Sequence, residues 1–295
     1  MSSIANNAME LNPINWGIQQ ISSGLQSVTI APIKDIISYA VPWIKAALNR
    51  HVYLIKENRP LIELMGGEEV FDSTQNEIAQ LAGLAKIKNE ICLYTSLSAP
   101  FAGDRGIFDN VVTFPLEHIK DKDFSYVNRY ERLLTPKQLE EGKWEFTENE
   151  TRFLLSIGVA ELTIYPLLKL VARVMVLALI IGLFFTPLGL YTGGAAFAVG
   201  MFLYLSIERA TQNKVDKRAR ELLTDRFVQA GMTPEKAKQQ STIVAINTVK
   251  KIQLQQLHIR QQGWIYECLI TPAGDVRFDY TVPSLNARIK KIQQS

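Results

Sequence analysis

The pattern of hydrophobic and polar positions along the chain is interrupted by one long apolar run, residues 174–207. The only ionisable side chains in this run are those of Tyr191 and Tyr204. A transmembrane helix needs about 20 apolar residues, so the run is longer than one span but short for two. Turn-forming residues lie near its middle, at 186–189 and 192–194. The pattern predicts a transmembrane helical hairpin, and a fully buried hairpin inside a large soluble fold is the alternative.

Basic residues flank the apolar run on both sides. Lysine and arginine next to a span favour the cytoplasmic or matrix side of the membrane. We therefore expect an integral membrane protein of a bacterial inner membrane or an organelle membrane, with both ends of the hairpin and the soluble part on that side. The flanking cations are Lys169, Arg173, Arg209, Lys214, Lys217 and Arg218.

Outside the apolar run, most segments have apolar residues at helical spacing. The sharpest helix start is the capping box from Thr147 to Glu150, in which each side chain can bond the other residue's backbone N–H. The helix behind it points toward the apolar run. The ranges predicted to be helical are 14–49, in short amphipathic pieces, and 73–84, 147–162, 208–229, 233–260 and 285–292.

Strand-like composition is confined to short runs. Residues 90–95 and 111–114 are two of them, separated by a segment typical of a loop. Two more, 264–270 and 276–280, flank a turn at 271–275. These runs predict a mainly α fold with a small antiparallel β element.

The layout divides the chain into four parts. We expect an N-terminal amphipathic helical region over 1–50, which lies on the membrane or packs on the domain. A soluble domain would then be formed by 51–165 and 208–295, on either side of a membrane hairpin over 166–207.

Composition and charge exclude several functions. With 47% hydrophobic and 21% charged residues, the chain is ordinary for a globular protein, and a net charge of +3 is too small to indicate nucleic-acid binding. An anionic membrane surface is the more natural electrostatic partner. The histidines are scattered at His51, His118 and His258, and no spacing typical of a zinc site or a phosphate loop is present. We therefore predict no metal and no cofactor.

The order of elements, with three short motifs, resembles the HtpX and CAAX-protease family of membrane zinc metallopeptidases. The zinc helix of that family reads hydrophobic-hydrophobic-x-H-E-x-x-H, and residues 154–161 follow its apolar frame. Residues 209–219 resemble the helix that carries the third ligand, and residues 281–289 resemble the C-terminal T-H-P-S-x-x-x-R-I motif. Ala99 to Ala102 and the run 111–114 are similar to the family's N-A-F-A loop and to the strand that edges its substrate cleft.

The resemblance implies a zincin-like metalloprotease fold interrupted by a transmembrane hairpin, with the chemistry of its site removed. Ile157 and Glu161 would stand at the two histidine ligands, Gly158 at the catalytic glutamate and Gln212 at the ligand glutamate. Retained family positions would be Arg209, Asp216 and Arg288, and the edge of the cleft would be Val111, Val112, Thr113 and Phe114.

A catalytic zinc site needs about three protein ligands and a base for the bound water, and neither Ile157 nor Gly158 can serve. The resemblance thus implies a catalytically inactive protease homologue that binds a peptide or protein partner, or regulates one, in membrane-protein quality control. Glu161, Gln212 and Arg209 would fill the vacated site with a hydrogen-bonded ion pair. The alternatives are a membrane-anchored scaffold unrelated to proteases and a hydrolase with a relocated active site, using Glu161 and Asp216. Expected partners are the lipid bilayer and a membrane-associated protein, in a possible homo- or hetero-oligomer, and no nucleic acid.

Overall fold

The computed structural model describes a mainly helical protein, which confirms this part of the prediction. The described residues are 52–54, 59–88, 90–96, 102–105, 110–115, 118–124, 131–135, 145–164, 189–275 and 283–294. The helices among them are α5 (Arg59–Met65), α6 (Glu68–Leu84), α8 (Glu148–Thr163), α10 (Gly189–Gln229), α11 (Pro234–Arg260), α12 (Trp264–Leu269) and α13 (Leu285–Gln294). The predicted segments 1–50 and 276–280 lie outside the described residues.

One four-stranded sheet accompanies the helices. Its strands are β1 (Val52–Leu54), β2 (Ile91–Ser96), β3 (Ala102–Arg105) and β4 (Asn110–Phe114), in the order β1-β2-β4-β3. The pairs β1–β2 and β3–β4 are antiparallel, but β2 and β4 run parallel. The expected antiparallel element is therefore a mixed sheet, because β3 folds back along the outer side of β4 and leaves β4 beside β2.

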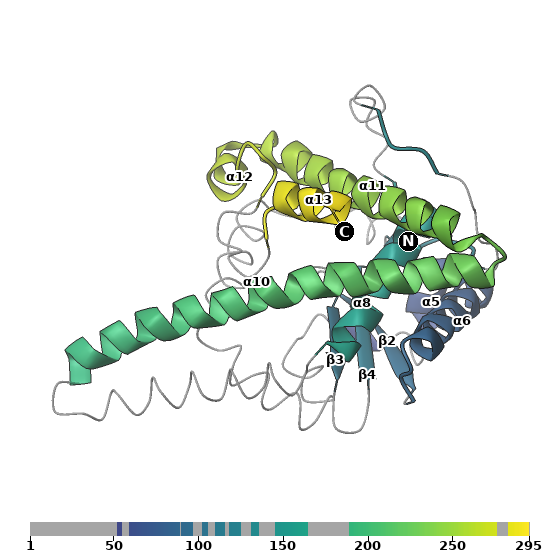
Figure 1. Ribbon diagram of the computed structural model, residues 1–295, viewed down its shortest axis with the longest axis horizontal. Coiled ribbons are helices and arrows are strands. Elements are labelled where there is room, and N and C mark those ends of the chain that lie inside the picture. The colour runs from purple at the N-terminus through teal and green to yellow at the C-terminus, as the bar shows by residue number, and fades with distance from the viewer. Residues whose placement is uncertain are drawn as a thin grey trace.

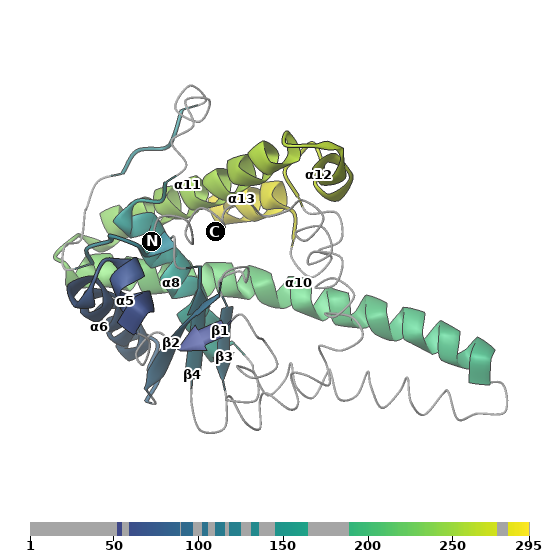
Figure 2. The ribbon, with the colours of Figure 1, turned by 180° about the vertical axis from the view of Figure 1, so that it is seen from behind.

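Helix α8 is the centre of the core. It contacts α10 and α11 as well as β3 and β4, so it lies between the long helices and the sheet (Figures 1 and 2). Almost every side chain from Asn149 to Ala160 is buried, including Phe153, Leu155 and Val159 at 0% exposure. An all-round buried helix of this kind needs partners on each side, and these partners hold the motif positions in place.

Helix α10 is the longest element. Its 41 residues correspond to about 60 Å at 1.5 Å per residue, and its N-terminal half extends away from the other helices and strands (Figure 1). The helix begins at Gly189 and is unbroken at 192–194, so the turn expected there is wrong. Glycine weakens a helix by about 1 kcal/mol without ending it.

The first arm of the predicted hairpin, with its turn at 186–188, lies outside the described residues. In the part of the chain that the structure describes, no helix combines the length and the apolar composition needed to cross a membrane.

The C-terminal region differs from the predicted β-hairpin. Residues 264–269, expected as a strand, form α12. Periodicity alone cannot distinguish a strand from a buried helix in so short an apolar run. The turn at 271–275 is confirmed, since the Thr271 N–H donates to the Asp275 carbonyl at 2.8 Å. Helix α13 follows and packs on α11 and α10 (Figure 1).

Candidate functional site

The predicted capping box is present at the start of α8. The Glu150 N–H donates to Thr147 Oγ1 at 3.2 Å, and the Thr147 N–H donates to Glu150 Oε2 at 2.8 Å. This cap fixes the first turn of α8 and thereby the position of the motif residues three turns further along the helix.

The motif positions on α8 are used for packing. Ile157 is buried, and Gly158 lies so close to β4 that an added Cβ would be 2.7 Å from Val112 Cγ1. This is closer than real Cβ contacts, so the helix and the strand meet here because residue 158 has no side chain. The carboxylate of a glutamate at this position would have no room. Glu161, one turn later, is half-buried.

The predicted edge of the cleft needs correction. Strand β4, which contains Val111, Val112, Thr113 and Phe114, is an interior strand paired with β2 on one side and β3 on the other. Val112, Thr113 and Phe114 are buried. A peptide cannot pair with a strand whose two sides are both occupied, and the edge of the sheet on this side is β3, which packs against α8. The loop-like composition of residues 96–110 concealed this strand.

Two retained motif positions meet although they are far apart in sequence. Arg288 on α13 donates to both carboxylate oxygens of Asp216 on α10, from Nε at 2.8 Å and from Nη2 at 2.7 Å. Both side chains are nine-tenths or more buried. Bidentate arginine–carboxylate pairs are among the strongest polar contacts in proteins, so this pair fixes α13 on α10.

The remaining motif positions lie on the facing helices α8 and α10, which pack together. Gln212 is half-buried and Arg209 is exposed. The hydrogen-bonded group of Glu161, Gln212 and Arg209 stays a prediction. Among the residues described, no three His, Cys, Asp or Glu side chains are grouped so that they could hold a metal ion.

The resemblance to the metallopeptidases is based on these short sequence motifs alone. Comparisons with models of known protein families, with curated proteins and with solved structures find no match. The family assignment therefore stays a prediction.

A buried ionic cluster that the sequence reading missed joins α6, α8 and α10. Glu77 on α6 forms ion pairs with Arg152, whose Nε lies at 3.0 Å from its carboxylate, and with Arg226, whose Nε lies at 3.1 Å. The Arg152 side chain is 0% exposed and also donates to Asn149 Oδ1 and to the Phe124 carbonyl. Burial lowers the pKa of Arg152, and the charge of Glu77 raises it. The available signal was a charged residue, Arg152, directly before the apolar run 153–155.

Two members of this cluster, Glu77 and Arg226, line a groove of about 600 Å³. The groove walls are mostly polar side chains of α6, with acidic residues at the rim. Its lining consists of Glu69, Asp72, Ser73, Asn76, Glu77, Gln80, Phe124 and Arg226. Since both arginines already share Glu77, we interpret the cluster as a clamp between three helices.

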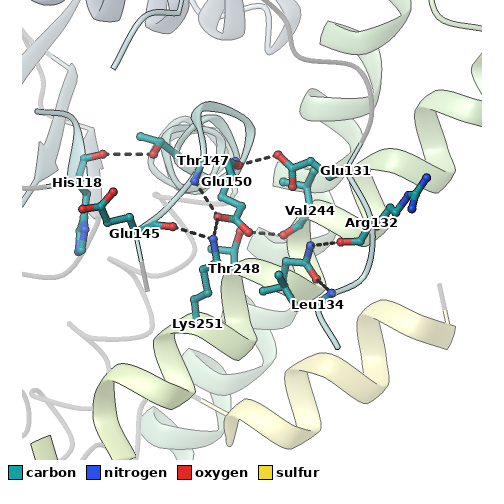
Figure 3. A network of polar contacts seen from close by, with 12 residues as sticks. His118, Glu131, Arg132, Leu134, Glu145, Thr147, Glu150, Val244, Thr248 and Lys251 are labelled. Atoms are coloured by element: carbon teal, nitrogen blue, oxygen red, sulfur yellow. Dashed lines mark hydrogen bonds and ion pairs between the residues drawn. The ribbon is translucent and has the colours of Figure 1, made fainter. Parts of the chain in front are cut away.

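A second polar network surrounds the N-terminus of α8 (Figure 3). Lys251 on α11 donates to Glu150 Oε2 at 2.6 Å and to the Glu145 carbonyl at 2.7 Å. Thr147 Oγ1 donates to Glu131 Oε1 at 2.6 Å while it also accepts the cap hydrogen bond. The Thr147 hydroxyl is thus committed on both sides, so it is poorly placed to act as a nucleophile.

The same network holds the extended segment 131–135 on α11. Gln240 accepts from the Glu131 N–H at 2.8 Å and donates to the Glu131 carbonyl at 3.3 Å. Two helical turns later, Asn247 accepts from the Leu134 N–H at 3.1 Å and donates to the Arg132 carbonyl at 2.9 Å (Figure 3). Two side-chain amides thus bond to the backbone of this segment as a neighbouring strand would.

Two titratable groups in this region have shifted pKa values. Burial raises the pKa of Glu131 to about 7, against the hydrogen bond from Thr147, which lowers it. Burial, and then the charge of Lys122, lower the pKa of His118 to about 4. The His118 ring packs edge-on against Phe146 at 4.9 Å. Neither side chain lines the groove beside α6 or belongs to the protease-like motifs. We interpret both as parts of the polar network around the N-terminus of α8.

Proposed function

We propose that the protein is a catalytically inactive homologue of the HtpX-type membrane metalloproteases. The observation that supports this most is a contrast within the motifs. The retained positions Asp216 and Arg288 form a buried bidentate pair, whereas Ile157 and Gly158 pack against their neighbours. A family site that kept its scaffold and lost its chemistry is expected to show this contrast.

In this proposal the fold is zincin-like, and residues 166–207 form the membrane hairpin. The soluble domain lies on the cytoplasmic or matrix side, and an extended segment of a partner protein binds to β3 by strand addition. This strand is the last of the sheet and lies beside α8, and the outer side of a terminal strand can pair with a peptide. The role is retention or regulation of a membrane protein rather than its cleavage.

The proposal predicts that the protein binds an unfolded protein and does not cleave it. The full-length chain is incubated with fluorescently labelled casein and zinc, with a photo-crosslinking amino acid at Asp104 in β3 or, as a control, at the exposed Lys238 on α11. We expect an increase in casein anisotropy, crosslinks from position 104 and not 238, and intact casein. Intact casein without binding would contradict the proposal and favour the scaffold alternative.

Cleavage of casein would favour the alternative of a hydrolase with a relocated active site. Analysis of the bound metal distinguishes that alternative from an inactive homologue. An active site that uses Glu161 and Gln212 would hold stoichiometric zinc, which would be lost in the Glu161→Ala, Gln212→Ala variant. Participation of Asp216 as a base is disfavoured, because both of its oxygens accept from Arg288. We expect no bound zinc in either form.

A further inference from the structure

A small pocket lies between α10 and α13, next to the Asp216–Arg288 pair. Its volume is about 60 Å³. Pockets for organic ligands measure roughly 300–1,000 Å³, so this one has room for a small ion and not for a substrate. Its lining residues are Asn213, Asp216, Lys217, Arg220, Arg288, Lys291 and Ile292.

Arg220 is the unusual member of this pocket. The residue is only 5% exposed, yet among the described residues it forms no ion pair with a carboxylate. Its Nη1 donates to the Ile292 carbonyl at 2.8 Å, close to the C-terminus of α13. A guanidinium has five N–H donors, and a buried charge normally has a charged or metal partner. The partial negative charge at the end of α13 offsets only part of this cation.

Nearby carboxylates are already used by other arginines. Asp216 is bound by Arg288, and Glu221, the residue after Arg220, pairs with Arg218 at 3.1 Å. Burial lowers the pKa of Arg220, and the charge of Glu221 raises it. Among the described residues that line the pocket there are four cations and one carboxylate, an excess of three positive charges.

We propose that this pocket binds one phosphate group, either inorganic phosphate or the monoester headgroup of phosphatidic acid. Arg220 supplies guanidinium donors on one side of the pocket, and Lys217 and Lys291, both exposed, supply further positive charge. Arginine donors combined with lysine charge are the usual means of binding phosphate. The anion neutralises the buried charge of Arg220 and connects α10 with α13. This site is independent of the proposed protease ancestry, since it involves no vacated ligand position.

The two exposed lysines of the pocket test the site without disturbing the buried arginine. Lys217→Ala with Lys291→Ala is compared with Lys214→Ala with Lys290→Ala, which removes two exposed lysines from the same helices outside the pocket. Inorganic phosphate is titrated into each full-length protein by calorimetry. We expect saturable binding that the first pair of changes weakens by roughly fivefold and the second pair leaves unchanged.

Short-chain phosphatidic acid, with short-chain phosphatidylcholine as the control, then identifies the source of the phosphate. Phosphatidic acid that binds more tightly than inorganic phosphate, with the same lysine dependence, assigns the site to a lipid headgroup. Weaker binding assigns it to free phosphate. Absence of saturable phosphate binding, or equal weakening by both pairs of changes, overturns the proposal.

Discussion

Arg288 donates two hydrogen bonds to Asp216, and through them helix α13 is fixed to the C-terminal half of α10. The residues are 72 positions apart in sequence. Asp216 and Arg288 match two different motifs of the resembled family. Descent from that family would explain why two residues so far apart in sequence are in contact. This contact has consequences for stability whether or not the ancestry is correct.

We expect Asp216→Ala to destabilise the protein by about 3–5 kcal/mol, because it leaves the buried Arg288 without its counter-charge. The free energy of unfolding, measured by urea denaturation, checks this. Glu221→Ala is the matched control on the same helix, since its pair with Arg218 is partly exposed. The control should cost no more than about 0.5 kcal/mol. Equal losses would show that the Asp216 pair is not a buried clamp.

The close approach of α8 and β4 at Gly158 makes a second prediction. Gly158→Ala places a Cβ 2.7 Å from Val112 Cγ1 and should destabilise by about 1–3 kcal/mol through overpacking. The control is Gly83→Ala in α6, where nothing lies within 4 Å of the added Cβ. This control should stabilise by up to about 1 kcal/mol, since alanine favours a helix.

A double-variant cycle shows whether the contact with Val112 is the cause. In the Val112→Ala background the added methyl group at residue 158 has space, so Gly158→Ala should lose most of its effect. An unchanged cost in that background would contradict the packing explanation. It would also remove the argument that a glutamate cannot occupy this position.

Local signals in the sequence predicted the start of α8 and the helices that follow it, because capping and helical periodicity act over a few residues. Thr147 and Glu150 form the expected box, and α11 begins at Pro234 after Thr233. Motif resemblance also selected Asp216 and Arg288, which meet.

Features that depend on distant partners could not be predicted in the same way. Glu77 lies 149 residues from Arg226, and only the packing of α6 on α10 brings them together. Strand β3 was hidden in a loop-like composition, and it makes β4 an interior strand. Residues 264–269 form a helix because tertiary context decides short apolar runs.

Attachment of segment 131–135 to α11 through two side-chain amides makes a third prediction. Asn247→Leu removes the partner of the Leu134 N–H and the Arg132 carbonyl while it keeps the volume of the side chain. We expect a loss of about 0.5–1.5 kcal/mol for each of the two part-buried hydrogen bonds that are removed. Hydrogen exchange at the Leu134 amide should accelerate.

The Gln240→Ala variant is the matched comparison, because it should accelerate exchange at the Glu131 amide, which Gln240 binds. Exchange at Leu134 would then change less than in Asn247→Leu. If neither amide responds, the segment is held by other contacts.

The raised pKa of Glu131 predicts a pH-dependent stability. Between pH 4.5 and about 7 this carboxyl is protonated in the folded protein and ionised in the unfolded chain. The folded state binds the additional proton, so stability falls as the pH rises across this interval. Glu131→Gln removes the titration and keeps an acceptor for Thr147. We expect it to stabilise the protein by about 3 kcal/mol at pH 8 and by almost nothing near pH 4.

Changing His118 should have the opposite effect, which makes it the natural control. The pKa of His118 is about 4 in the folded protein and 6.5 in the unfolded chain. Between these pH values the imidazole is neutral in the folded protein and protonated in the unfolded chain. Its contribution therefore rises with pH over nearly the interval in which that of Glu131 falls, and the two partly cancel in the unmodified protein. Relative to that protein, His118→Leu should gain stability in acid and Glu131→Gln should gain it in base. Urea denaturation at several pH values checks both, and differences that do not vary with pH would contradict these burial effects.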